Sequence, residues 1–260
     1  NRGLDVTVIL DAAFHGRNAN QAAYDHLSAA GVNVAWAPEG IIVHEKALAV
    51  DDSEAVVSTA NFYSKYYTTS RDAMIATTDP ADVAAITATV KSDYAAASTG
   101  HLSKATTAPN LIWSPAARAQ FLQTIDAAHH DIDLTSEEFK EHTIAIAVTK
   151  AVQRGVTCRM VLNSDAADTP EAKSVKQAGC SIHVIPKSTK GLYMHEKVII
   201  TDAGVPGQTT VILGSQNIGT RSLLQNRELS IKLDSTKAPK IIAAIENQFN
   251  ADYNSTTAAQ

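Results

Sequence analysis

Two short segments of the chain carry the same reactive residue types at the same spacing. The shared pattern is His-x-Lys-x4-Asp, and its two copies are His44, Lys46 and Asp51, and His195, Lys197 and Asp202. A single match would be expected by chance in roughly a few per cent of chains, whereas two matches are a strong signal. An imidazole can attack an electrophile or transfer a proton, and an ammonium stabilises developing negative charge. The paired motifs therefore indicate one site with two histidines and two lysines.

The residues that follow each motif also repeat, so the chain reads as two copies of one module. In each copy an apolar segment ends near an asparagine, and an acidic residue stands eleven positions further on. These pairs are Asn61 with Asp72, and Asn217 with Glu228. Each copy closes with apolar residues at helical spacing, over residues 81–97 and 238–253. Internal repetition of this kind indicates a duplicated domain.

The second copy opens with elements for which the first copy has no counterpart. They are strands at 111–113 and 131–134 and helices at 115–128 and 142–154, with Pro115 in the first helical turn. The first copy begins directly at a strand over 6–10. We expect modules at 1–97 and 111–260, with a linker at 98–110. We also expect about 40 to 50 further residues, in a segment before Asn1 or in a partner chain, to complete the first module.

The alternation of strands and helices predicts an α/β fold with mostly parallel sheets flanked by helices. A histidine and a lysine two positions apart on a strand point to the same face, so each motif would direct both side chains into one pocket. Glu45 and Glu196 alternate away from that pocket and are expected to be outward-facing supports. Residues 203–208 contain two glycines and a proline and predict a long hairpin turn.

The duplicated motif resembles the HKD signature of the phospholipase D superfamily, in which each motif is followed by a Gly-Ser-x-Asn segment. Residues 214–217 read Gly-Ser-Gln-Asn and match that segment in full, whereas residues 58–61 read Ser-Thr-Ala-Asn. The resemblance covers nearly the whole chain. It implies two modules related by pseudo-twofold symmetry, with one active site at their interface.

The resemblance also implies roles for the site residues. His44 would be the nucleophile that forms a phosphohistidine, and His195 would be the acid and base. Lys46 and Lys197 would neutralise the phosphate and stabilise five-coordinate phosphorus. The remaining assignments are Asn61 and Asn217 as donors to phosphate oxygens, helped by Thr59 and Ser215, and Asp51 and Asp202 as supports within their own modules.

A carboxylate usually holds a reactive imidazole in one tautomer by bonding its far nitrogen. Asp72 and Glu228 occupy the positions where the superfamily places such acids. By resemblance this contact crosses between the modules, which pairs Glu228 with His44 and Asp72 with His195.

The implied reaction is metal-independent hydrolysis of a phosphodiester, with no cofactor, or transfer to an alcohol that outcompetes water. The net charge is −5 and the pI is about 6.0, which disfavours a broad basic surface for duplex nucleic acid. A phospholipid or another small diester is therefore the expected substrate. Two alternatives remain open: a single-strand nuclease with a local basic groove, and a catalytically inactive phosphate-binding protein. A zinc site is disfavoured because each motif brings a lysine into the pocket.

Cysteine content and apolar patterning bear on the compartment. Cys158 and Cys180 are compatible with one disulfide or with two buried thiols. The few cysteines and the low charge favour a secreted or periplasmic protein. No segment approaches the roughly 18 to 20 apolar residues of a membrane span, although peripheral membrane contact is compatible with a lipid substrate.

Two further groups of residues lie close to the motifs in sequence. The first is aromatic and follows Asn61: Phe62, Tyr63, Tyr66 and Tyr67. These rings can line a substrate cleft or pack in the ordinary way. The second group is Lys187 and Lys190, which precede His195 and can steer an anion or belong to a solvated loop.

Overall fold

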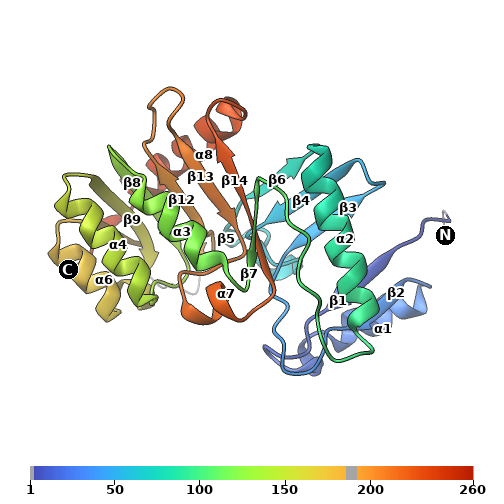
Figure 1. Cartoon of the computed structure of the whole chain (residues 1–260). Helices are drawn as coiled ribbons and strands as arrows, with labels where there is room; N and C mark the ends of the chain where they lie inside the picture. The colour runs from blue at the N-terminus through green and yellow to red at the C-terminus, as the bar shows by residue number, and fades with distance from the viewer. Residues whose placement is uncertain (1–2, 186–191, 260) are drawn as a thin grey trace.

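The computed structural model describes residues 3–185 and 192–259 and shows two halves that lie side by side (Figure 1). The strands of the first half are β1 (Thr7–Leu10), β2 (Asn33–Trp36), β3 (Ala47–Val50), β4 (Glu54–Ser58), β5 (Ser70–Arg71) and β6 (Met74–Thr77). Its helices are α1 (Gln21–Ala29) and α2 (Pro80–Ala96). The first half therefore ends on α2, close to the expected helix over 81–97.

The second half is larger. Its strands are β7 (Leu111–Ser114), β8 (Asp131–Ser136), β9 (Thr157–Asn163), β10 (Ser181–Ile185), β11 (Tyr193–Met194), β12 (Val198–Thr201), β13 (Thr210–Gly214), β14 (Glu228–Asp234) and β15 (Thr257–Ala258). Its helices are α3 (Ala117–Asp126), α4 (His142–Gln153), α5 (Ser164–Ala167), α6 (Pro170–Gln177), α7 (Thr220–Leu224) and α8 (Pro239–Ser255). The segment between α2 and β7 contains no helix or strand, and the expected module boundaries around it stay predictions.

One eight-stranded sheet organises the second half, in the order β15-β10-β9-β8-β12-β13-β14-β7. The neighbours β8, β9 and β10 are parallel, and all other pairs in this sheet are antiparallel. The expected α/β class with flanking helices is confirmed. The expectation of mostly parallel sheets is wrong, because β12 and β13 are joined by a hairpin turn and β7, β14 and β15 also pair antiparallel with their neighbours.

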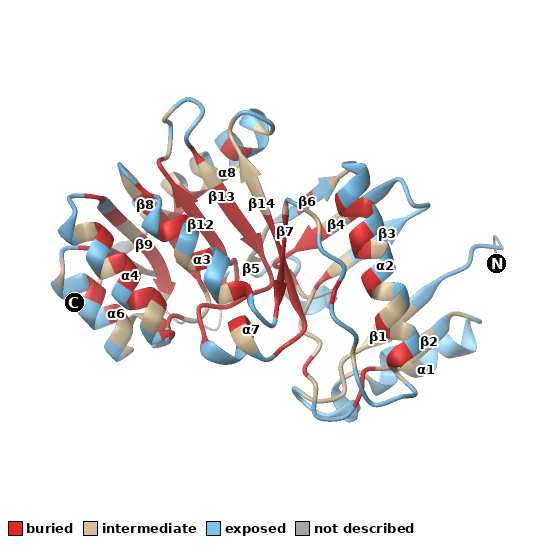
Figure 2. Ribbon diagram, in the orientation of Figure 1, coloured by how far each residue is buried: buried red, intermediate tan, exposed pale blue. Residues whose placement is uncertain are grey.

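Two apolar clusters form the core, and Figure 2 shows the buried residues concentrated in the strands of the large sheet. The first cluster packs α3, α4 and α6 against that sheet, with buried side chains such as Phe121, Ile144 and Val148. The second cluster combines residues of both halves, including Ile75 and Ile86 from the first and Leu229 and Phe249 from the second. The halves are therefore joined by a shared apolar interface.

The first half contains two separate small sheets. β1 pairs in parallel with β2, and β3, β4 and β6 form an antiparallel sheet. Among the described residues, no strand connects the sheet that contains β1 with the sheet that contains β3. In the second half, by contrast, β8 lies between β9 and β12 within one sheet. Leu48 and Val50 on β3 are about half exposed. The expectation of an added segment or partner chain stays a prediction.

Several local expectations can be compared with the structure. The hairpin turn over 203–208 is confirmed between β12 and β13. Pro115 does not lie in the first turn of its helix, because Ala116 has a left-handed φ of 93° and α3 begins at Ala117. Cys158 and Cys180 form a disulfide that joins β9 to the start of β10, with Cα atoms 4.6 Å apart.

Candidate active site

The two motif segments lie at the boundary between the halves, where the backbone of each half binds the other. The His and Lys of each motif precede β3 or β12. They do not lie within a strand, contrary to the expectation. The backbone N–H of His44 donates to the carbonyl oxygen of Arg227, at 2.9 Å. The backbone N–H of His195 donates to the carbonyl oxygen of Arg71, at 3.1 Å. Each histidine is thus positioned by the opposite half.

His44 is held by a carboxylate of the second half, the pairing that the resemblance implies. Nδ1 of His44 lies 2.9 Å from Oε2 of Glu228, whose side chain is completely buried. The other oxygen of Glu228 accepts hydrogen bonds from Ser222 and Asn226, at 2.7 and 2.8 Å. Burial and the nearby Lys46 ammonium lower the pKa of His44, so the imidazole is neutral at pH 7 with Nε2 available. A neutral, oriented imidazole is suited to nucleophilic attack.

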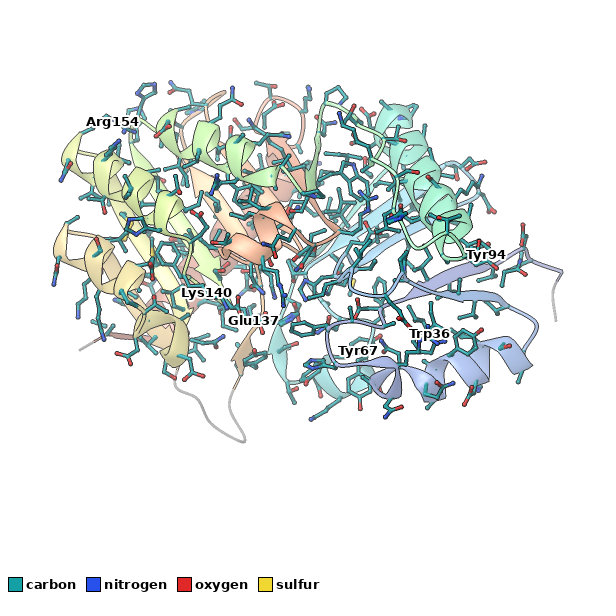
Figure 3. The ribbon with its side chains drawn as sticks, turned by 60° about the horizontal axis from the view of Figure 1, so that its bottom comes forward. Trp36, Tyr67, Tyr94, Glu137, Lys140 and Arg154 are labelled. Carbon is teal, nitrogen blue, oxygen red and sulfur yellow. A yellow bond between two sulfur atoms is a disulfide. The ribbon has the colours of Figure 1, made fainter. Side chains whose placement is uncertain are left out.

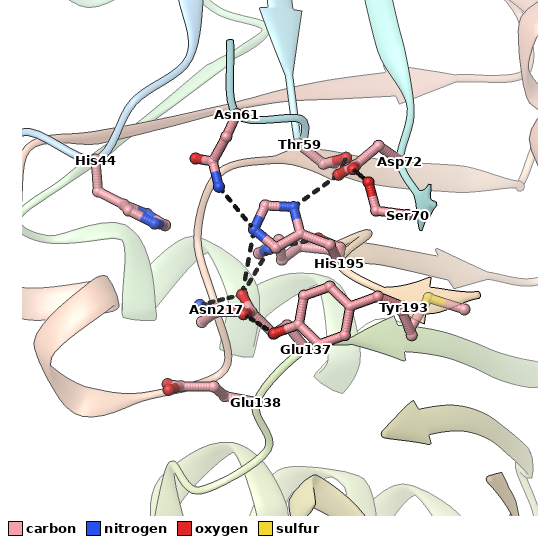
Figure 4. Close-up of polar contacts among 12 residues, drawn as sticks. His44, Thr59, Asn61, Ser70, Asp72, Glu137, Glu138, Tyr193, His195 and Asn217 are labelled. Atoms are coloured by element: carbon pink, nitrogen blue, oxygen red, sulfur yellow. Dashed lines mark hydrogen bonds and ion pairs between the residues drawn. The ribbon is translucent and has the colours of Figure 1, made fainter. Parts of the chain in front are cut away.

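His195 is held in the corresponding way by the first half (Figure 4). Nδ1 of His195 lies 2.8 Å from Oδ1 of Asp72, which also accepts a hydrogen bond from Thr59, while Oδ2 of Asp72 accepts one from Ser70. Burial acts to raise the pKa of Asp72, but the hydrogen bond with His195 and those from the hydroxyls outweigh it and lower the pKa. The carboxylate therefore orients the His195 imidazole, an arrangement suited to proton transfer.

The two motif lysines are both buried, but their side chains have different neighbours. Each ammonium donates to the carbonyl oxygen of the histidine two residues before it. Lys197 also forms an ion pair with Oε2 of Glu137, at 2.9 Å, whereas Lys46 has no such partner among the described residues. Burial lowers the pKa of Lys46 to about 7.

Glu137 is a site residue that the sequence analysis did not identify. It follows β8 directly and lies at the boundary between the halves (Figure 3). Its Oε2 accepts hydrogen bonds from Lys197 and from Nδ2 of Asn217, at 2.9 and 3.2 Å, and lies 3.5 Å from Nε2 of His195. Burial acts to raise the pKa of Glu137, but Lys197 and His195 outweigh it, so the group is a carboxylate. The feature of the sequence that could have identified Glu137 is its position at the end of a parallel strand, where ligand sites commonly lie.

The asparagines lie at the site, but the hydroxyl residues beside them do not face it. Nδ2 of Asn61 is 3.4 Å from Nε2 of His195. Oδ1 of Asn217 is buried without a hydrogen-bond partner among the described residues. The expectation that Thr59 and Ser215 help to bind phosphate stays a prediction, and both side chains are fully buried. Thr59 bonds Asp72, and the Ser215 hydroxyl accepts from the backbone N–H of Leu229, so both support the acid-bearing segments.

The two motif aspartates differ. Oδ1 of Asp202 accepts the backbone N–H groups of His129 and His130, at 2.9 and 2.6 Å, and thereby supports the turn before β8. Asp51 is exposed, has a left-handed φ of 51°, and forms no hydrogen bond within the described part of the chain. Among the described residues, therefore, Asp202 makes a contact of the expected supporting kind within its module, and Asp51 does not.

Two buried ion pairs that cross between the halves were also missed. Nε of Arg227 lies 2.8 Å from Asp93 on α2, and Nε of Arg71 lies 2.8 Å from Asp252 on α8. Each pair is bidentate, with a second bond at 3.0 or 2.9 Å. The sequence did contain a signal for these pairs. An arginine directly precedes the site acid in both copies, and a tyrosine directly follows both of the paired aspartates, Asp93 and Asp252.

Several aromatic side chains close to the site residues in sequence or in space are exposed. Phe62, Tyr63 and Tyr67 are each at least half exposed, and the ring of Phe14 lies 5.9 Å from that of His44. These rings are available to a substrate and are not packed in the core. Lys187 and Lys190 lie outside the described residues. Within the residues that are described, no group of three His, Cys, Asp or Glu side chains is placed to hold a metal ion. No helix among them is long and apolar enough to cross a membrane.

Comparison with known proteins agrees with the duplicated site. The family model described as cardiolipin synthase, PLD-like domain, matches residues 1–94 and 121–253. No curated protein matches the sequence. Among solved structures, phosphatidylserine synthase from Haemophilus influenzae is similar over 100% of this chain and 76% of its own, at 11% identity and a TM-score of 0.70.

Two other solved structures are similar over different shares of the chain. Polyphosphate kinase from Porphyromonas gingivalis is 15% identical over 94% of this chain and 41% of its own, with a TM-score of 0.62. The phospholipase D family member Nuc from Salmonella typhimurium is 21% identical over 58% of this chain and 96% of its own, with a TM-score of 0.49. On the strength of the family match, which includes both His-Glu-Lys motifs, the chain belongs to the PLD-like domain family of the phospholipase D superfamily.

Proposed function

We propose that this protein is a metal-independent phosphodiesterase that hydrolyses phospholipids through a phosphohistidine. The observation that carries the proposal is the matched pair of histidines, each bound at Nδ1 by a carboxylate of the opposite half. This arrangement occupies Nδ1 of each ring and leaves Nε2 of each as the reacting atom. The lowered pKa of His44 keeps its imidazole neutral for nucleophilic attack, and His195 takes the role of acid and base in the same site.

The proposed reaction has two steps. In the first, Nε2 of His44 attacks phosphorus, the bond to the leaving alcohol breaks, and His195 protonates the departing oxygen. In the second, a water attacks the phosphorus while His195 accepts its proton, and the P–N bond to His44 breaks. An alcohol in place of that water gives transfer and not hydrolysis.

The remaining polar groups have supporting roles in this scheme. Lys46 and Lys197 neutralise the diester and stabilise five-coordinate phosphorus, and the amides of Asn61 and Asn217 donate to its oxygens. These groups supply the charge stabilisation that a metal ion provides in other enzymes. The reaction is therefore proposed to proceed without a metal.

The lipid substrate and the compartment are part of the same proposal. The exposed aromatic rim at Phe14, Phe62, Tyr63 and Tyr67 is suited to peripheral contact with a lipid surface, because aromatic rings favour the membrane interface. The Cys158–Cys180 disulfide supports an oxidising location, secreted or periplasmic. The acidic net charge supports a lipid over a nucleic acid.

The test offers phosphatidylcholine, a chromogenic phosphodiester and single-stranded DNA in parallel, each with and without EDTA. We expect cleavage of the lipid, no effect of EDTA, and loss of at least about 10³-fold in H44A and H195A. Thermal unfolding of both variants checks that the fold is retained. Near-normal rates in both variants, or activity that EDTA abolishes and zinc or magnesium restores, would contradict the proposal. Cleavage of DNA alone would favour a nuclease.

A further inference from the structure

The carboxylate of Glu137 lies on the donors that the proposed mechanism assigns to the substrate phosphate (Figure 4). Its Oε2 accepts hydrogen bonds from the ammonium of Lys197, at 2.9 Å, and from the amide of Asn217, at 3.2 Å. The same oxygen lies 3.5 Å from Nε2 of His195. Three groups that are proposed to meet the diester therefore meet a carboxylate of the protein itself.

Glu137 differs from the other two carboxylates of the site in the histidine atom that it approaches. Asp72 and Glu228 contact the Nδ1 atoms and leave Nε2 of each ring for the reaction. Glu137 approaches Nε2 of His195, the nitrogen that has to exchange a proton with the substrate. Glu137 therefore stands inside the reacting site, whereas the other two acids support the rings from behind.

The position of Glu137 is fixed at both of its carboxylate oxygens. While Oε2 binds the donors of the site, Oε1 accepts a hydrogen bond from the hydroxyl of Tyr193, at 2.5 Å. Burial and the Glu137 carboxylate raise the pKa of Tyr193, so this hydroxyl keeps its proton and stays a donor. Glu138, the next residue, turns away from the site in Figure 4 and pairs with Lys140, at 2.9 Å. The contact thus belongs to one of two adjacent glutamates.

A bound diester needs the donors that Glu137 now holds. Burial acts to raise the pKa of Glu137, but the surrounding charges and hydrogen bonds, Lys197 foremost, lower it, so the group is an anion. Two anions placed against the same donors repel each other. The Glu137 side chain is 21% exposed, so it has an open side toward which it can turn. A diester can therefore reach Lys197 and Asn217 only when Glu137 turns away.

We infer that Glu137 is an internal competitor of the substrate phosphate, which closes the site at rest and must turn away before a diester binds. This inference rests on the proposed function, since it takes a diester as the anion that the site accepts. Closure lowers the affinity for a ligand that binds through its phosphate alone. A whole substrate offsets the displacement of Glu137 through the contacts of its other groups. Glu137 thus selects against small phosphate anions.

Isothermal titration calorimetry with inorganic phosphate measures this competition without turnover. The proteins compared are the wild type, E137Q and E138Q, which makes the same change of net charge one residue away. We expect E137Q to bind phosphate at least about tenfold more tightly than the wild type, because a neutral amide holds the donors less strongly than a carboxylate. E138Q should keep the wild-type affinity. The KM for the chromogenic diester should fall in E137Q and stay unchanged in E138Q.

A purely supporting role for Glu137 predicts the opposite result. If Glu137 served to hold Lys197 and Asn217 in place for the phosphate, E137Q would bind phosphate more weakly and would have a higher KM. Y193F is a second variant, because it keeps the charge of Glu137 and removes the hydrogen bond at Oε1. Its affinity for phosphate should rise by a smaller factor than that of E137Q. Y193F replaces E137Q in the test if thermal unfolding shows that E137Q does not fold.

The outcomes separate this inference from the proposed function. An unchanged or weaker affinity for phosphate in E137Q, or in Y193F where it replaces E137Q, would overturn the inference. An equal gain in E138Q, or no detectable binding of phosphate by any of the proteins, would overturn it as well. The proposed function fails on a different result, the absence of phosphodiester cleavage by the wild type, because the binding of inorganic phosphate does not depend on turnover.

Discussion

The segments His44-Glu45-Lys46 and His195-Glu196-Lys197 have the same sequence, and each is bound through its backbone to the opposite half. Their side-chain neighbours differ because β8 runs beside the second segment only. Thr135 on β8 donates to Glu196, at 2.9 Å, and Glu137 at its end pairs with Lys197. Glu45 has a buried oxygen without a hydrogen-bond partner among the described residues, and Lys46 has no ion pair there.

This comparison shows that a repeated motif does not produce a repeated environment. Burial raises the pKa of Glu45 to about 8 and lowers that of Lys46 to about 7. Burial raises the pKa of Glu196 less, to about 7, where Thr135 supplies a hydrogen bond that favours the carboxylate. The two copies can therefore take different roles in the chemistry, although the sequences of the two segments are identical.

The largest effect on stability is expected at the two ion pairs that cross between the halves, and these two pairs are buried to different extents. Arg227 and Asp93 are almost completely buried, whereas the Arg71 side chain is 29% exposed. R227M should therefore destabilise the fold by about 3 to 5 kcal/mol, because it leaves Asp93 buried without its partner. R71M, the matched variant, should cost less. Urea unfolding measures both, and equal losses would show that burial does not distinguish the two pairs.

The second prediction is a tenfold effect of pH on kcat/KM, caused by the titration of Lys46. The charged form of the Lys46 side chain binds phosphate. Because the pKa of Lys46 is about 7, this charged form is lost as the pH rises above neutrality. The kcat/KM of the wild type should therefore fall about tenfold per pH unit above neutrality. K46R should move this limb to higher pH, because arginine keeps its charge. K197R should keep the wild-type limb, and the same limb in all three proteins would rule out Lys46 as its source.

The smallest effect concerns the unpaired Glu45. Its pKa is raised to about 8, so between pH 4.5 and 8 the unfolded chain ionises at this position while the folded chain stays protonated. Stability then decreases as the pH rises through this window. E45Q does not titrate and should raise the melting temperature by about 5 °C at pH 8, and by much less at pH 5. E196Q should give a smaller gain, and a gain in E45Q that is independent of pH would exclude ionisation as its cause.

The sequence was sufficient to locate the site but not to complete it. Both motifs, both asparagines and the acids Asp72 and Glu228 could be placed because the repeat shows which residues correspond. The crossing of these acids between the halves was implied by the resemblance. Glu137 could not, since its contact with Lys197 depends on the pairing of β8 with β12, two strands far apart in the chain. Nothing in the sequence distinguishes it from Glu138.

Two other differences have the same physical origin. The hydroxyls of Thr59 and Ser215 were expected to face phosphate, but neighbouring strands bury them against the acid-bearing segments. The direction of the strands was expected from helix alternation, but β12 and β13 follow one another without a helix, and β13 and β14 pair antiparallel although α7 lies between them. Long-range pairing decides both features, and local patterns do not encode it.

The central claim is that His44 becomes phosphorylated while His195 transfers protons. It is tested by mixing H195A with a diester that has a good leaving group, quenching within seconds, and locating the added phosphoryl group by peptide mass spectrometry. A good leaving group needs little protonation, so H195A should still form the intermediate but release it slowly. The account predicts the modification on His44 in H195A and none in H44A. A modification on His195 in H44A, or none in either variant, would contradict it.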